Sequence, residues 1–201
     1  MNWLFFDLGS TLLDETEVTE KCVRGSLEQS AVPYDEFIDK MKAFAFRNKN
    51  AYKCTLEYYG LAKTKWDISL EKLYPGVPEL LERLSKKYNL GIIANQMPEL
   101  EKRLSSFGID KFFKVIVYSA AFGKAKPDEE IFLSALKKAN CKPEDAVMIG
   151  DRLDNDIIPA QKLGMKTLWV KQGLGGLGNP SLLEKAANYV IENITEIENI
   201  L

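Results

Sequence analysis

Five short apolar runs alternate with amphipathic stretches along the chain, and this alternation limits the possible folds more than any other feature. The runs are rich in β-branched or aromatic residues and lie at 3–6, 90–94, 114–118, 146–149 and 166–170. The stretches between them, such as PELLERLSKKY and PDEEIFLSALKKA, have helical periodicity. Strands that alternate with helices in this way form a parallel sheet with helices on both faces. The sequence therefore predicts an α/β fold.

The connection between the first two runs departs from this pattern. Residues of about 15–74 contain no good strand, only helical patterns such as TEVTEKCVRGSLEQSA and YDEFIDKMKAFAFRNKN. A connection of this length is better explained by an inserted subdomain than by a loop. We expect a discontinuous α/β core, 1–14 and 75–201, with an all-helical subdomain at 15–74.

The composition excludes several classes of chemistry. The chain has no histidine, which excludes Ser-His and Cys-His catalysis and histidine zinc sites. Three widely spaced cysteines predict reduced thiols of a cytoplasmic protein. The net charge of −2 gives no general attraction to nucleic acid, and no apolar run approaches membrane-spanning length. We expect a cytoplasmic protein with neither nucleic-acid nor membrane partners.

Polar residues follow four of the five runs. They are Asp7 after the first run, Asn95 after the second, Lys124 and Lys126 after the third, and Asp151 and Asp156 after the fourth. In an open parallel sheet, ligands bind at the carboxyl ends of the strands, so these side chains are expected to share one edge. Carboxylates supply the oxygen ligands that Mg²⁺ prefers, and a lysine offsets the charge of a phosphoryl group. A carboxylate beside the metal can act as a nucleophile.

Four segments resemble the motifs of the haloacid dehalogenase (HAD) superfamily. They are DLGSTLL at 7–13, GIIAN at 91–95, KPDEEIF at 126–132 and MIGDRLDND at 148–156. Their order and spacing match over nearly the whole chain. The resemblance implies a Rossmann-like core with a helical cap inserted after the first strand.

The resemblance also implies roles for the residues of these motifs. Asp7 would be the nucleophile, Thr11 would orient it, and Lys126 would stabilise the phosphorylated intermediate. We assign phosphate binding to Ser10 and Asn95. The expected reaction is hydrolysis of a small phosphorylated metabolite through a phospho-aspartate at Asp7. The sequence leaves open which metabolite this is, and whether the protein is a monomer or a dimer.

The cofactor implied by the resemblance is Mg²⁺. The carboxylates of Asp7 and Asp151 and the backbone carbonyl of Gly9 would hold it, with Asp156 as a direct or outer partner. Asp156 also opens the predicted helix DIIPAQKLG, so an N-cap role stays open beside metal contact.

Two positions depart from the pattern of phosphatases in this superfamily. Gly9 replaces a second aspartate that acts as general acid and base, and Ala94 replaces a hydroxyl residue that binds phosphoryl oxygens. We therefore expect slow turnover. The other explanation of Gly9 is a backbone with positive φ, which glycine adopts readily.

Two other functions remain open. A metal-free 2-haloacid dehalogenase also lacks the second aspartate, but it would gain nothing from the carboxylates of Asp151 and Asp156. A binding or regulatory protein on a degenerate scaffold would explain Gly9 and Ala94, but not the nucleophile and lysine.

Two further stretches invite other interpretations. Residues 173–178, GLGGLG, satisfy a dinucleotide fingerprint, but only about 23 residues follow, too few for the rest of that unit. We expect a flexible surface loop there, beside a last helix that begins at Pro180. Residues 40–65 hold seven basic residues against one acid. This stretch is interpreted as an amphipathic helix pair, with attraction of an anionic substrate or a nucleic acid as alternatives.

Overall fold

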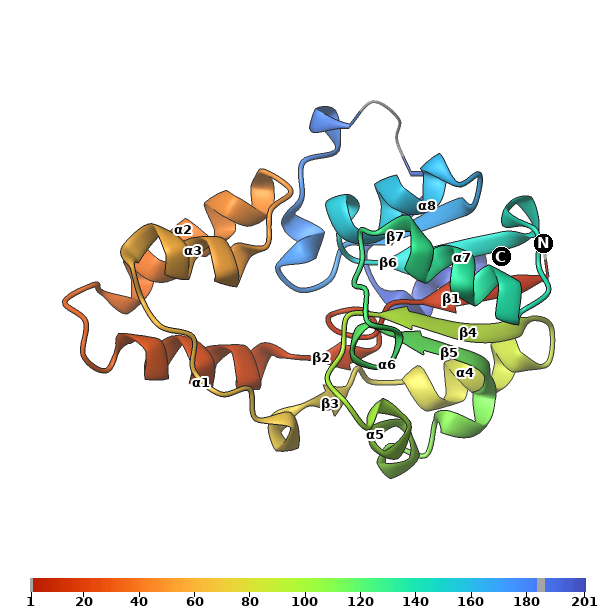
Figure 1. Cartoon of the computed structure of the whole chain (residues 1–201), viewed down its shortest axis with the longest axis horizontal. Coiled ribbons are helices and arrows are strands. Elements are labelled where there is room, and N and C mark those ends of the chain that lie inside the picture. Colours follow the sequence, from red (N-terminus) through yellow and green to blue (C-terminus); the bar gives the residue numbers. More distant parts are fainter. Residues whose placement is uncertain (1, 184–186) are drawn as a thin grey trace.

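A six-stranded parallel sheet forms the centre of the molecule, in the strand order β5-β4-β1-β6-β7-β8 (Figure 1). The structure, a computed structural model, describes residues 2–183 and 187–201. The strands are β1 (Trp3–Phe6), β4 (Asn89–Ala94), β5 (Phe113–Tyr118), β6 (Ala146–Gly150), β7 (Lys166–Val170) and β8 (Tyr189–Ile191). The first five correspond to the five apolar runs. The predicted α/β fold with a Rossmann-like core is confirmed.

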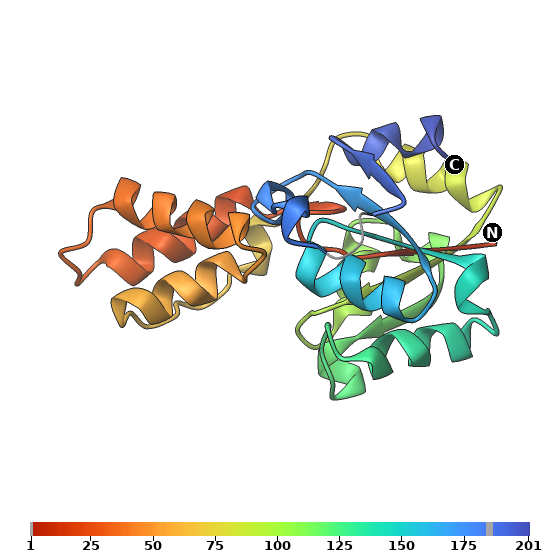
Figure 2. The same cartoon turned by 90° about the horizontal axis from the view of Figure 1, so that it is seen from above.

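Helices cover both faces of the sheet, and the alternation of side chains along β1 explains why (Figures 1 and 2). Leu4 and Phe6 pack into the cluster on one face, whereas Phe5 packs into the cluster on the other. The first face carries α4 (Val77–Ser85) and α5 (Leu100–Ser106), and the second α6 (Ser119–Phe122), α7 (Glu129–Lys138) and α8 (Ile158–Lys162). None of the described helices is long and apolar enough to cross a membrane.

Helix α7 begins directly after the loop that carries Lys126. The side chain of Asp128 accepts a hydrogen bond from the Glu130 amide at 2.9 Å and so caps the helix. Acidic residues in the first turn and basic residues in the last turn complement the helix dipole. These local signals fix where the helix starts and therefore where the preceding loop ends.

Three helices, α1 (Thr16–Leu27), α2 (Tyr34–Phe46) and α3 (Ala51–Tyr59), extend to one side of the sheet (Figure 2). They share a hydrophobic cluster of their own, formed by Val23, Phe37, Met41, Ala45, Ala51 and Leu56. The chain enters and leaves this region through two short antiparallel strands, β2 (Leu13–Asp14) and β3 (Lys72–Leu73). We propose that residues 15–74 form a separate cap, since they have their own core and a narrow connection.

The carboxyl-terminal part differs from the expected last helix. Pro180 begins only a 3₁₀ turn, Pro180–Leu182, while residues 184–186 lie outside the described part of the chain. Beyond them, β8 pairs with β7, and a 3₁₀ helix, Ile194–Asn199, follows. Ile194 and Ile197 pack into the same cluster as α4. The edge strand has only three residues, too few to show a periodic pattern in the sequence.

The proposed division into core and cap predicts where local unfolding occurs. Phe37→Ala removes a fully buried ring from the cap cluster, which typically costs about 3–5 kcal/mol. We expect faster amide hydrogen exchange in α1, α2 and α3, with protection in β1, β4 and β6 unchanged.

Phe132→Ala is the matched control, because this ring is equally buried but lies on α7 against the sheet. It should increase exchange in the sheet instead. If Phe37→Ala loosens the sheet strands as much as the helices, the two regions unfold together and the division is wrong.

Candidate active site

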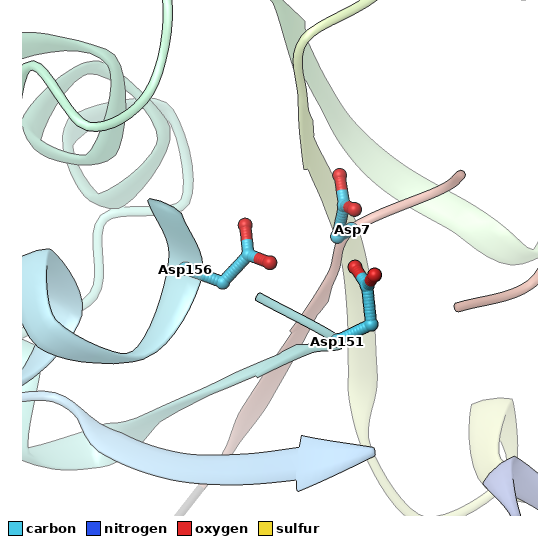
Figure 3. A group of neighbouring side chains, drawn as sticks. All are labelled: Asp7, Asp151 and Asp156. Atoms are coloured by element: carbon cyan, nitrogen blue, oxygen red, sulfur yellow. The ribbon is translucent and has the colours of Figure 1, made fainter. Parts of the chain in front are cut away.

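Three aspartates meet at the carboxyl-terminal edge of the sheet (Figure 3). Asp7 follows β1, and Asp151 follows the neighbouring strand β6. Asp156 comes from the π-helical turn Leu153–Ile157 and directs its carboxylate toward the other two. One carboxylate oxygen from each residue lies within 4.8 Å of the others. All three residues are buried, with exposed fractions of 9%, 3% and 0%.

Lys126 joins two of these aspartates. Its ammonium group donates hydrogen bonds to Asp7 Oδ1 at 2.7 Å and to Asp156 Oδ1 at 2.5 Å, and its side chain is fully buried. Lys124, the other lysine of this loop, is instead exposed and pairs with Asp128 and Glu130. The structure thus brings Lys126 into the site and leaves Lys124 outside it.

Asn95 fixes the backbone of the lysine loop. Its Nδ2 donates to the Lys126 carbonyl at 2.9 Å, and its Oδ1 accepts from the Lys126 amide at 2.7 Å. Asn95 is itself exposed to the pocket described below. The contact positions Lys126, and phosphate binding by Asn95 remains a proposal.

Burial shifts the ionisation of the cluster. It raises the pKa of Asp7 to about 6; Lys126 opposes this shift and the nearby Asp156 adds to it. Burial, together with Asp156 and Asp7, raises the pKa of Asp151 well above its usual value. Burial alone would lower the pKa of Lys126, but its two carboxylate partners raise it above the usual value. The site therefore carries more negative charge than its single ammonium group offsets.

The donor set fits a hard divalent cation. Both carboxylate oxygens of Asp156 are occupied, one by Lys126 and the other by the Arg152 amide at 3.0 Å. The Asp151 carboxylate, in contrast, accepts no hydrogen bond from any described residue, although Asp151 is largely buried, with an exposed fraction of only 3%. Asp151 lines the pocket described below, and a largely buried carboxylate without a donor is costly unless a cation balances it. Asp7 and Asp151 are thus the best placed of the three to hold Mg²⁺.

The N-cap role that the sequence leaves open for Asp156 is wrong. Helix α8 begins at Ile158, and Asp156 lies inside the preceding turn, where its carboxylate accepts hydrogen bonds from Lys126 and from the amide of Arg152.

Trp169 also holds the loop after β6 in place, because its indole N–H donates to the Asp151 carbonyl at 2.6 Å. Trp169 was not predicted, because only its place at the end of β7 brings it to this loop.

Thr11 and Ser10 lie in the tight loop that follows Asp7. Thr11 is fully buried, and within residues 2–183 and 187–201 its hydroxyl has no hydrogen-bond partner. Orientation of Asp7 by Thr11 therefore remains a proposal. The Ser10 hydroxyl donates to Glu15 Oε2 at 3.4 Å, and Ser10 lines the pocket.

Glu15 lies against Gly9 and was not predicted as a site residue. A Cβ atom added at Gly9 would lie 2.5 Å from Glu15 Oε1 and 2.7 Å from Oε2. Gly9 is not among the residues with positive φ, so that explanation of the glycine is wrong. Burial, with the neighbouring Asp7 and Glu71, raises the pKa of Glu15 to about 8. The carboxyl group of Glu15 fills the space that a side chain at position 9 would enter.

The glycine-rich loop at 173–178 borders the same site. A Cβ atom at Gly175 would lie 2.0 Å from Asp151 Oδ2, and one at Gly173 would lie 2.7 Å from Ser10. Asn48, at the end of α2, exchanges hydrogen bonds of 3.0 and 2.9 Å with the backbone of Asn179. The expected last helix is wrong, and the loop lies at the surface only in part, since Gly173 and Leu177 are exposed whereas Gly176 and Gly178 are buried. The loop closes against the aspartates, and its glycines allow the backbone to approach them.

A pocket of about 670 Å³ opens from the aspartates toward α3 and the segment after it. Its floor includes Asp7, Asp151 and Glu15. Its outer wall carries mostly basic and aromatic side chains, namely Lys49, Tyr52, Lys53, Lys63 and Trp66, together with Glu57, which pairs with Lys53. The volume falls in the usual range for small-molecule sites. The site combines a buried acidic cluster, one lysine and a pocket of metabolite size, as expected for a hydrolase of the α/β class.

The chain belongs to the haloacid dehalogenase-like hydrolase family, whose model matches residues 4–170. A glyceraldehyde 3-phosphate phosphatase from Pyrococcus furiosus is 30% identical, and the match covers 98% of this chain and 92% of that protein. The protein is therefore an enzyme of this hydrolase family.

Two solved structures share the fold over nearly their whole length. A HAD phosphatase from Thermococcus onnurineus has a TM-score of 0.68 and 22% identity, covering all of this chain and 97% of the other. A 2-haloacid dehalogenase from Pseudomonas syringae has a TM-score of 0.61 and 22% identity, covering 99% and 97%. Because both activities occur on this fold, the fold alone does not decide between them.

The excess negative charge of the site predicts two opposite trends as the pH rises: the stability of the metal-free protein falls, and the stabilisation by Mg²⁺ grows. In metal-free protein the free energy of unfolding should fall as the pH rises from about 4 to 6. The pKa of Asp7 is about 6 in the folded state against ~3.9 unfolded, so the folded state holds the extra proton between these values. Mg²⁺ would bind the ionised carboxylates, so the stabilising shift in melting temperature that we expect from it should grow over the same range.

Asp151→Asn should remove most of the Mg²⁺ shift, because it removes a charged ligand. Asp154→Asn is the matched control, since Asp154 lies three residues away and pairs with Arg152. A Mg²⁺ shift in Asp151→Asn equal to that of Asp154→Asn would contradict the metal assignment.

Proposed function

We propose that the protein is a Mg²⁺-dependent phosphatase that acts on a small phosphorylated metabolite through a phospho-aspartate at Asp7. The observation that carries the proposal is the buried cluster itself. Lys126 contacts the nucleophile and Asp156, while the carboxylate of Asp151 accepts no hydrogen bond from any described residue. A cluster of this kind suits a cation and a phosphoryl group together.

The proposed reaction has two displacement steps at phosphorus. A carboxylate oxygen of Asp7 attacks the phosphorus atom, the bond to the leaving oxygen breaks, and that oxygen takes up a proton. Water then attacks the phosphorus of phospho-Asp7, loses a proton and releases inorganic phosphate. The Lys126 ammonium, 2.7 Å from Asp7 Oδ1, offsets the charge on the phosphoryl oxygens in both steps.

Asp7, Asp151 and the Gly9 carbonyl would hold Mg²⁺, with Asp156 as an outer partner. The ion supplies positive charge next to the phosphoryl oxygens and holds them in place. Asp156 serves indirectly in this arrangement, because its oxygens already hold Lys126 and the Arg152 amide.

The pocket supports an anionic substrate of metabolite size. Lys49, Lys53 and Lys63 line its outer wall, so the basic stretch predicted from residues 40–65 faces the site in part. The phosphatase from Pyrococcus furiosus, to which this chain is similar over nearly its full length, acts on a three-carbon sugar phosphate according to its name. We propose a substrate of that class, with the cap helices forming the outer wall.

A metal-free 2-haloacid dehalogenase is the second candidate, favoured by Gly9 and by the shared fold. Against it stand Asp151 and Asp156. A metal-free site has no need of two further buried carboxylates, whose desolvation is unfavourable.

A panel of phosphorylated metabolites, tested with and without Mg²⁺, distinguishes these functions. We expect Mg²⁺-dependent release of phosphate from at least one compound, and its loss in Asp7→Asn because an amide is not a nucleophile here. Its melting temperature is the control for folding, because asparagine keeps the shape of Asp7 but leaves Lys126 with Asp156 as its one charged partner among the described residues. Chloride release from 2-haloacids without Mg²⁺, and no phosphate release, would contradict the proposal.

A further inference from the structure

Glu15 takes the place of the side chain that position 9 lacks. An ideal Cβ atom at Gly9 would lie 2.5, 2.7 and 2.8 Å from Oε1, Oε2 and Cδ of Glu15. Real atoms do not approach one another this closely. The Glu15 carboxyl group therefore lies where the first atoms of a side chain at position 9 would be. The carboxyl group also lines the same pocket as Asp7. A carboxyl group is therefore present beside the nucleophile, although residue 9 does not supply it.

The backbone between Gly9 and Glu15 explains how Glu15 comes to lie against Gly9. The amides of Leu12 and Leu13 both donate to the Leu8 carbonyl at 2.9 Å, so the chain turns tightly after Asp7. Two residues later Glu15 lies against Gly9, just before α1 begins at Thr16.

The ordinary structural roles of a glutamate at this position do not apply. Glu15 precedes α1, but its side chain makes no capping hydrogen bond. The Thr16 amide is satisfied by Asp14 Oδ1 at 2.9 Å. Among the described residues, no lysine or arginine forms an ion pair with Glu15, and the Ser10 hydroxyl is its one hydrogen-bond partner, at 3.4 Å. Neither a helix cap nor an ion pair explains why this carboxyl group lies against Gly9 at the pocket.

We propose that Glu15 is the general acid and base of this site. This inference rests on the proposed phosphatase function. The Glu15 carboxyl group donates its proton to the leaving oxygen as the P–O bond breaks and Asp7 becomes phosphorylated. The resulting carboxylate takes a proton from the water that attacks the phosphorus of phospho-Asp7. The cycle ends with Asp7 free, Glu15 protonated, and one water consumed.

Two consequences follow from this placement. The slow turnover expected from Gly9 no longer follows, because the missing aspartate has a substitute from the cap entrance. A side chain at position 9 and the present position of Glu15 also exclude each other, so Gly9→Asp alone displaces Glu15 and gains little.

The test compares Glu15→Gln with the parent on two substrates, glycerol phosphate and 4-nitrophenyl phosphate. Glycerol is a poor leaving group, so its kcat should fall by about 10²-fold or more, within the ~10²–10⁴-fold range of general acid–base catalysis. The nitrophenolate needs no proton to leave, so phosphorylation of Asp7 remains fast while attack by water becomes slow. Rapid-mixing measurements should therefore show a burst of nitrophenol close to one per site, which a merely structural role would not produce.

The swap Gly9→Asp with Glu15→Ala provides a second variant. It moves the carboxyl group back to position 9 and should regain at least about tenfold in kcat on glycerol phosphate over Glu15→Ala alone. Glu20→Gln is the control, because Glu20 is exposed and pairs with Arg24 on the same helix. It should behave as the parent does.

The outcomes separate this inference from the proposed function. If the parent's turnover depends on Asp7 but Glu15→Gln keeps the parent's kcat on glycerol phosphate, or shows no burst, Glu15 is not the acid and base. Loss of the Mg²⁺ shift in melting temperature in Glu15→Gln would make Glu15 a metal ligand and would also overturn the inference. If the parent itself shows no Asp7-dependent turnover, the proposed function fails first.

Discussion

The buried ammonium group of Lys126 holds the site together. It joins Asp7, at the end of β1, to Asp156, in the turn after β6, and Asn95 at the end of β4 fixes its backbone. Removing one partner from a buried ion pair typically costs ~3–5 kcal/mol, so these contacts fix the ends of three strands relative to one another. The proposed nucleophile, the lysine and the carboxylates proposed to bind the metal are thus in position before a substrate arrives.

The same contacts leave the site with excess negative charge. Asp7 and Asp151 have raised pKa values because burial and the neighbouring carboxylate of Asp156 disfavour their ionised forms, and one lysine does not offset both. An anionic substrate would find such a site unfavourable without a further cation. The proposed Mg²⁺ balances the floor of the pocket, and Lys49 and Lys63 provide positive charge at its outer wall, where Lys53 pairs with Glu57.

Most of the fold and much of the site could be predicted from the sequence because strand ends in a parallel sheet share one edge. Asp7, Lys126, Asp151 and Asp156 were predicted together on this argument, and the structure places them together, although their catalytic roles remain proposals. The features that were not predicted depend on contacts that no local sequence pattern indicates. Glu15 contacts Gly9 because the chain makes a tight turn between them, and the loop at 173–178 contacts Asp151 although the two are distant in the sequence. Strand β8 is too short to show a periodic pattern.

The central claim is that Asp7 carries the phosphoryl group during turnover, and chemical trapping tests it most directly. Borohydride reduces an acyl phosphate to an alcohol, so quenching the enzyme during turnover should convert Asp7 to homoserine, which peptide mass spectrometry detects. We expect this conversion at position 7 only with both substrate and Mg²⁺, and not at Asp151 or Asp156. Turnover of a phosphorylated substrate with no reduction at position 7 would contradict the account, as would reduction at another aspartate.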